Sequence, residues 1–94
     1  MANYIARVEL HSATYEDYEE LHDYMRQQGF LRMIRGGDGK DYHLPTGTYV
    51  MRNSNVSGSD ALGRAGNAAA QTGKKSSIIV ADWDSATWRG LSSN

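Results

Sequence analysis

Three polar residues near the start of the chain could do acid–base chemistry together if one strand directs them to the same side. Arg7, Glu9 and His11 alternate with apolar residues, so an extended backbone places all three on one face. An imidazole that titrates near neutrality could take the proton of an RNA 2′-hydroxyl, with Glu9 as its partner and Arg7 as a phosphate contact. Most lone histidines are ordinary surface residues, and that interpretation stays open.

Arginines and aromatic residues on or beside the predicted strands could extend such a site. Arg32, Arg35 and Arg52 follow a stretch, residues 9–23, that holds six acidic residues and no lysine or arginine. An acidic helix face and a basic sheet side could orient a polyanion, although solvated surface charge explains the same pattern. Tyr42, Tyr49 and Trp83 could stack on unpaired bases, or they could simply pack in the core or at its rim.

The residues that could hold a metal ion do not form a recognisable motif. His11, His22 and His43 lack metal-ligand spacing. Asp82 and Asp84 could hold Mg²⁺, but an aspartate after a strand is more often a turn residue or helix cap. We therefore predict no metal site and no cofactor.

Composition indicates one globular domain, residues 1–94. Its 94 residues are 39% hydrophobic and 22% charged, with a formal net charge of −1, which is too apolar and too neutral for intrinsic disorder. Without cysteine there is no disulfide, thiolate ligand or cysteine nucleophile. We see neither a leader pattern nor a membrane-length apolar run, so we expect a cytoplasmic protein without a membrane partner.

The spacing of apolar residues predicts how the elements alternate. Residues 3 to 10 alternate in polarity, as in a half-buried strand. A helix then follows Thr14, a capping residue, and ends at Gly29. Pro45 and Gly47 interrupt the third strand, so its regular part is 48–52. The predicted strands are 3–10, 30–35, 42–52 and 77–81, the helices are 15–28 and 60–72, and 84–94 is a short C-terminal extension.

This β-α-β-β-α-β order predicts an α+β fold of the ferredoxin-like type. Right-handed crossovers would place both helices on one face of a four-stranded antiparallel sheet. The other face, with Arg7, Glu9 and His11, would remain open to solvent or a partner.

Three segments of the chain form a recognisable set: the first strand Tyr4-Ile5-Ala6-Arg7-Val8-Glu9, the helix end Gly29-Phe30, and Asp38-Gly39-Lys40-Asp41-Tyr42-His43-Leu44-Pro45 leading into Tyr49-Val50-Met51. These segments resemble the GhoS-like endoribonuclease antitoxins of type V toxin–antitoxin systems. After about residue 55 the resemblance rests on element order alone. It implies a ferredoxin-like fold shared with small CRISPR-associated nucleases, and an antitoxin that cleaves the messenger RNA of a membrane-lytic toxin.

The resemblance also implies site residues, with two departures from the family pattern. The related nucleases carry a carboxylate near the end of strand one, and Glu9 stands there with one methylene more than aspartate. An arginine on the first helix of the antitoxins corresponds to His22 here. The catalytic candidates are Glu9, His11 and His22, and the RNA-binding candidates are Arg7, Arg32, Arg35, Tyr49 and Arg52. Because of the two departures, a chain that keeps the fold and has lost catalysis remains an alternative.

Three functions follow, in order of preference. The first is an antitoxin-like endoribonuclease that cleaves single-stranded messenger RNA. The second is a non-catalytic binding or inhibitor module, encoded by a phage or mobile element, that uses its open sheet or an edge strand on a protein or RNA partner. The third is a structural homodimer formed through the sheet, which would bury Ile5 and Tyr49.

Overall fold

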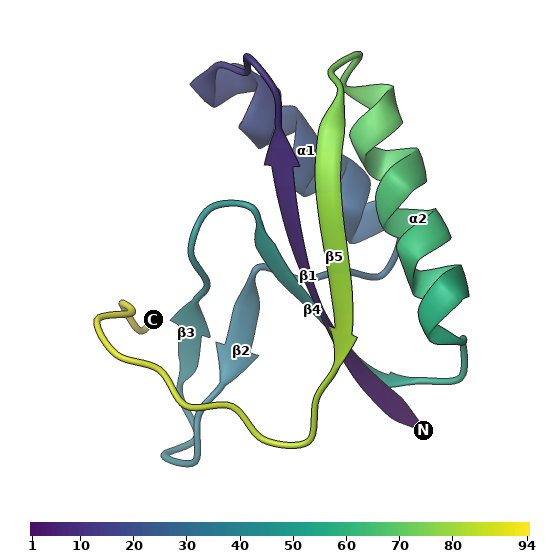
Figure 1. Cartoon of the computed structure of the whole chain (residues 1–94). Coiled ribbons are helices and arrows are strands. Elements are labelled where there is room, and N and C mark those ends of the chain that lie inside the picture. The colour runs from purple at the N-terminus through teal and green to yellow at the C-terminus, as the bar shows by residue number, and fades with distance from the viewer.

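The computed structural model describes residues 1–94, and the chain forms five strands and two helices (Figure 1). The elements are β1 (Ala2–Leu10), α1 (Tyr15–Gln27), β2 (Met33–Arg35), β3 (Asp41–His43), β4 (Thr48–Ser54), α2 (Gly58–Gln71) and β5 (Ser76–Asp82). The α+β class and the two helices agree with the prediction. Neither helix is long and apolar enough to span a bilayer.

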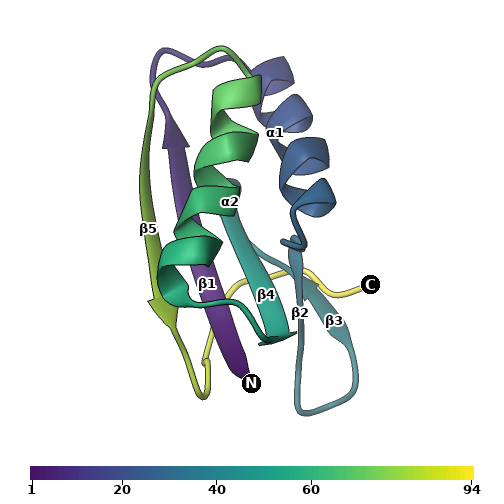
Figure 2. The ribbon, with the colours of Figure 1, turned by 90° about the vertical axis from the view of Figure 1, so that its right-hand side faces the viewer.

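The main sheet has three antiparallel strands in the order β4-β1-β5, with both helices against one of its faces (Figure 2). Strand β1 directs its buried residues toward the helices, where Leu21 and Met25 of α1 and four alanines of α2 complete the core. The residues of β1 in this core are Tyr4, Ala6, Val8 and Leu10. Because the buried side chains of α2 are all alanines, that helix can lie close to the sheet.

Local sequence determines where the helices begin. The Thr14 hydroxyl accepts a hydrogen bond from the Asp17 backbone N–H, and the Asp17 carboxylate accepts one from the Thr14 N–H, which completes a capping box. The Ser57 hydroxyl caps α2 by accepting a hydrogen bond from the Asp60 backbone N–H. Gly29 has φ of 94°, a left-handed conformation that ends α1 at little cost for a glycine.

The prediction of one four-stranded sheet is wrong. Leu31 still pairs with Val50 of β4, but the chain then leaves the sheet, and β2 and β3 form a separate two-stranded sheet. Phe30 is buried in the helix-side core, whereas Ile34 is buried in a second core on the other face. In one regular strand, residues four positions apart face the same side of the sheet. Because Phe30 and Ile34 are buried on opposite sides, the chain has to leave the sheet between them.

The second core covers part of the face that was expected to be open. It contains Ile34, Leu44 and Val50, with partly buried residues Ile5, Tyr42, Trp83, Trp88 and Leu91 packed against it. The C-terminal segment reaches this core by running alongside β3, where the His43 N–H donates to the Ser92 carbonyl and the Asn94 N–H to the Asp41 carbonyl. The expected short extension is therefore part of the fold.

The same packing contradicts the prediction that a dimer through the sheet would bury Ile5 and Tyr49. Ile5 faces the second core on one side of the sheet, and Tyr49 is fully buried in the helix-side core on the other. The two residues lie on opposite faces of the sheet, and the chain itself buries Tyr49 fully and Ile5 partly.

Replacing Trp88 with alanine should lower the free energy of unfolding by about 2 kcal/mol. The indole packs against Tyr42, with 5.4 Å between ring centroids, and against the second core. Urea unfolding followed by circular dichroism measures the change. The control is Arg89→Ala, which alters an exposed neighbour without an ion pair and should stay within about 0.5 kcal/mol of wild type. Equal effects of the two substitutions would show that the C-terminal segment does not stabilise the fold.

Candidate functional site

The predicted site residues fall into two groups on different parts of the surface. Arg7 and Glu9 are exposed on the helix-free face of β1, and His11 is exposed directly after that strand. We call these three residues the open-face row. His22, Arg32, Arg35 and Arg52 line a groove instead. The structure therefore does not gather all of the predicted residues at one site.

The open-face row is held by contacts with neighbouring elements. The Arg7 guanidinium donates to the Thr46 carbonyl at 2.9 Å, and His11 Nε2 lies 2.9 Å from Ser77 Oγ on β5. Glu9 forms no ion pair and is exposed. None of the three residues lines either of the two main cavities of the molecule.

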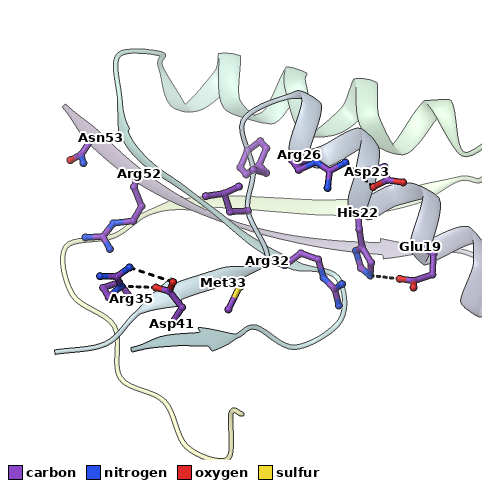
Figure 3. Close-up of a pocket in the computed structure, with 12 residues that line it drawn as sticks. Glu19, His22, Asp23, Arg26, Arg32, Met33, Arg35, Asp41, Arg52 and Asn53 are labelled. Atoms are coloured by element: carbon purple, nitrogen blue, oxygen red, sulfur yellow. Dashed lines mark hydrogen bonds and ion pairs between the residues drawn. The ribbon is translucent and has the colours of Figure 1, made fainter. Parts of the chain in front are cut away.

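The groove opens between α1 and the β2–β3 hairpin, along the outer side of β4 (Figure 3). It has a volume of about 830 Å³. We call it the arginine groove because it carries four arginines. Its lining residues are Glu19, His22, Asp23, Arg26, Phe30, Leu31, Arg32, Met33, Arg35, Asp41, Arg52 and Asn53.

Two of the four arginines are already neutralised by carboxylates. Arg26 pairs with Asp23 on α1 at 3.1 Å, and Arg35 makes a two-point contact with Asp41 across the hairpin. Arg32 and Arg52 form no ion pair. The Arg52 guanidinium lies 5.7 Å from the centroid of the Trp83 ring, a cation–π distance that leaves its charge available. The groove therefore offers two uncompensated cations to an anionic ligand.

A chain of three polar side chains connects the groove to the core. Glu19 Oε2 lies 3.5 Å from His22 Nε2, and His22 Nδ1 lies 2.7 Å from the Tyr49 hydroxyl. Figure 3 shows Glu19, His22 and Arg32 at the same end of the groove. Tyr49 is fully buried, whereas Glu19 is half exposed. The imidazole thus has one nitrogen in the core and the other directed at the groove.

The hydrogen-bond partners assign the tautomer of His22. The buried Tyr49 hydroxyl has no partner except Nδ1, so it donates its proton there, because a buried hydroxyl proton without an acceptor is costly. The neutral ring then carries its own proton on Nε2, facing Glu19 and the groove. Burial, and after it the charge of Arg32, lowers the pKa of His22, which favours this neutral form.

The three aromatic residues that were predicted to stack on bases pack against other parts of the protein instead. Tyr49 is fully buried, and burial raises the pKa of its hydroxyl, so the prediction that it contacts RNA is wrong. The Tyr42 hydroxyl donates to Asp38 at 2.6 Å while its ring packs against Trp88. Trp83 belongs to the second core. All three rings therefore pack within the fold and are not free to stack on bases.

Glu19, Arg26 and Asp41 are groove residues that the sequence analysis did not select. Glu19 and His22 are three positions apart, a spacing that brings side chains together on a helix and could have identified the pair. Asp41 could be identified only once the hairpin register was known, because it faces Arg35 across the two strands. No group of three or more histidine, aspartate or glutamate side chains is arranged to share a metal ion.

The fold and the groove together define a small α+β domain with an arginine-lined site suited to a polyanion. The comparison with protein families then identifies it. The family model described as "Endoribonuclease GhoS" matches residues 1–89 of the chain. The chain therefore belongs to the GhoS endoribonuclease family, the antitoxins of type V toxin–antitoxin systems, as the resemblance indicated. No curated protein and no solved structure matches it.

Replacing Tyr49 with phenylalanine should change the tautomer of His22. In the wild type, ¹⁵N chemical shifts should show an unprotonated Nδ1 and a protonated Nε2. Without the phenol the two neutral tautomers should mix, and the free energy of unfolding should fall by about 1 kcal/mol because Nδ1 loses its partner. The control is Tyr24→Phe on α1, the helix that carries His22. It removes a hydroxyl that has no hydrogen-bond partner and should leave the His22 signals unchanged. A wild-type Nδ1 that carries the proton would contradict the assignment.

Proposed function

We propose that this protein cleaves single-stranded RNA in the arginine groove. The observation that carries the proposal is the grouping of two unpaired arginines with a carboxylate and a neutral imidazole in one cavity. The family match supports an endoribonuclease, and therefore an RNA substrate. The groove supplies a place where the substrate backbone could lie.

Arg32 and Arg52 bind the RNA backbone in this proposal. Both are exposed, both line the groove, and neither is neutralised by a carboxylate. Arg26 and Arg35 are held by Asp23 and Asp41, so they contribute mainly to the shape and field of the groove. This division follows from the ion pairs and not from the number of arginines alone.

Glu19 and His22 carry the chemistry in this proposal. The Glu19 carboxylate takes the proton of a 2′-hydroxyl, and the 2′-oxygen attacks the adjacent phosphorus. The bond from phosphorus to the 5′-oxygen breaks, and that oxygen takes a proton from water, leaving a 2′,3′-cyclic phosphate. The His22 Nε2–H and Arg32 stabilise the charge that develops on the phosphoryl oxygens.

The open-face row is the other candidate site for the same activity. There His11 would be the base, Glu9 its partner and Arg7 the phosphate contact. We favour the groove because the row lies outside both main cavities, and because Arg7 and His11 already contact Thr46 and Ser77. Separate histidine substitutions distinguish the two sites.

We place this activity in the cytoplasm, where an antitoxin would meet the messenger RNA of its toxin. A single-stranded region of that message is the substrate class that fits a groove open to solvent along one side of the sheet. The non-catalytic binding module remains the alternative, and it would use Arg32 and Arg52 without any need for Glu19.

His22→Asn and Glu19→Gln should each lower kcat on a fluorescent single-stranded oligoribonucleotide by about 100-fold or more. Asparagine keeps an acceptor for the Tyr49 hydroxyl but removes the N–H that faces the groove. Gel analysis of the products should show a 2′,3′-cyclic phosphate end, and EDTA should leave the rate unchanged. Loss of cleavage in EDTA would contradict the proposed chemistry.

Asparagine at the other two histidines provides the matched controls. His43→Asn changes a residue that contacts Asn94, away from both candidate sites, and should keep wild-type cleavage. His11→Asn tests the open-face row and should also keep it. If only His11→Asn abolished cleavage, the active site would be the row. If the wild type bound RNA without cleaving it, the binding module would replace the enzyme.

Arg32→Met and Arg52→Met should each weaken binding of an uncleavable 2′-O-methyl oligonucleotide. Each should also reduce the slope of log K against log salt by about 0.7, the contribution of one contact with a single-strand phosphate. Filter binding at several salt concentrations gives both quantities. Arg64→Met changes an exposed arginine on α2, outside the groove, and should preserve affinity and slope. Unchanged slopes in the two groove variants would place the RNA elsewhere.

A further inference from the structure

The outer edge of β5 carries backbone groups that nothing in the fold pairs. β5 is the terminal strand of the order β4-β1-β5, and only its inner edge bonds to β1. The register with β1 runs without a shift from Asp82 to Ser76. The free edge is therefore straight enough to accept another strand along its length.

This edge lacks the features that usually prevent pairing between molecules. It has no proline, bulge or charged side chain before Asp82, and its centre is Ile78-Ile79-Val80. Ile79 is 66% exposed, which is unusual for an isoleucine in the middle of a strand. We therefore expect this long apolar edge to pair with another strand.

A shallow cavity beside the same edge continues the apolar surface onto α2. It has a volume of about 480 Å³ and lies between β5 and the first turns of α2. Its apolar lining includes Leu62, which is 44% exposed, together with Tyr4 and the three central residues of β5. The exposed surface thus extends from the strand edge to the adjoining helix.

We propose that β5 pairs antiparallel with β5 of a second copy of this chain, about a two-fold axis at Ile79. Such an interface is self-complementary, as a two-fold axis requires. Ile79 then lies opposite Ile79 of the second copy, and Ile78 lies opposite Val80. Residues on the helix side of each strand stay on the helix side, so the two sheets join as one six-stranded sheet with all four helices on the same face.

The charges at the two ends of β5 favour a second copy in this orientation. Lys74 and Lys75 precede the strand, and Asp82 and Asp84 end and follow it. Antiparallel pairing centred on Ile79 brings these lysines near Asp82 and Asp84 of the second copy at both ends of the interface. Lys75 forms no ion pair within its own chain, whereas Lys74 also lies 3.7 Å from Asp17. Parallel pairing would instead bring like charges together.

This dimer leaves the proposed active site free. The arginine groove lies along β4, at the opposite edge of the three-stranded sheet from β5. Association and RNA cleavage are therefore separate properties, and a variant that fails to associate should keep its cleavage rate per chain. The open-face rows of the two copies would lie on one continuous sheet surface.

Charge substitutions at Ile79 test both the interface and its axis. In the Ile79→Lys variant two lysines would meet across the axis, and in Ile79→Glu two glutamates would meet, so each variant alone should stay at 10.4 kDa. A 1:1 mixture should form a heterodimer, because lysine then lies opposite glutamate. Sedimentation is measured up to the highest soluble concentration, since interfaces below about 1,200 Å² are often weak.

Ala70→Lys, on an exposed position of α2, adds the same charge away from the edge and should associate to about twice 10.4 kDa as the wild type does. Circular dichroism checks that each variant folds. A wild type that stays monomeric at every concentration would overturn the proposal and leave the edge to a strand of another protein. Dimers of Ile79→Lys, or a mixture of the two charge variants that does not associate, would overturn it as well.

Discussion

The burial of β1 between two strands and under two helices is the constraint on which the structure depends. Its alternate residues Tyr4, Ala6, Val8 and Leu10 are buried in the helix-side core, and β4 and β5 bond to its two edges. Where β1 extends past the start of β4, its edge is covered by local contacts: the Val8 N–H donates to the Gly47 carbonyl and the Leu10 N–H to the Tyr18 hydroxyl. A one-residue slip would send the core residues to the opposite face, so the register of the sheet is tightly determined.

The arginine groove follows from the departure of the chain after Leu31. Had residues 30–35 continued as a fourth strand, they would have lain along β4 beneath α1. Instead the hairpin moves to the other face to bury Ile34, and the side of β4 between α1 and the hairpin stays open. Arg32 and Arg35 are carried on the departing segment, whereas Arg52 projects from β4 itself. The burial of Ile34 in the second core thus opens the groove and also places Arg32 and Arg35 in it.

Much of the fold could be predicted from sequence because the information is local. Alternation in residues 3–10 and the Thr14 cap determine their own elements, and both predictions are confirmed. The separation of the hairpin could not be predicted, since it depends on which of two cores receives Phe30 and Ile34. Of the residues that the sequence offered for the site, His22 and three arginines line the groove, whereas Tyr49 is buried. The burial of Tyr49 could not be predicted, because the sequence of a strand does not show which of its aromatic residues faces the core.

His22 stands where the resemblance to the antitoxins implies an arginine, and under the proposed function the two side chains can be compared as donors to a phosphate. An arginine offers N–H donors to a phosphate in every protonation state, whereas a histidine offers a lone pair or an N–H depending on its tautomer. Here the buried Tyr49 hydroxyl donates to Nδ1 and thereby keeps the proton on Nε2. The ring still presents a donor to the groove, but a neutral one, so the positive charge at this end comes from Arg32. The proposed mechanism therefore requires a base other than the imidazole, and Glu19, 3.5 Å from Nε2, is the carboxylate that we propose for this role.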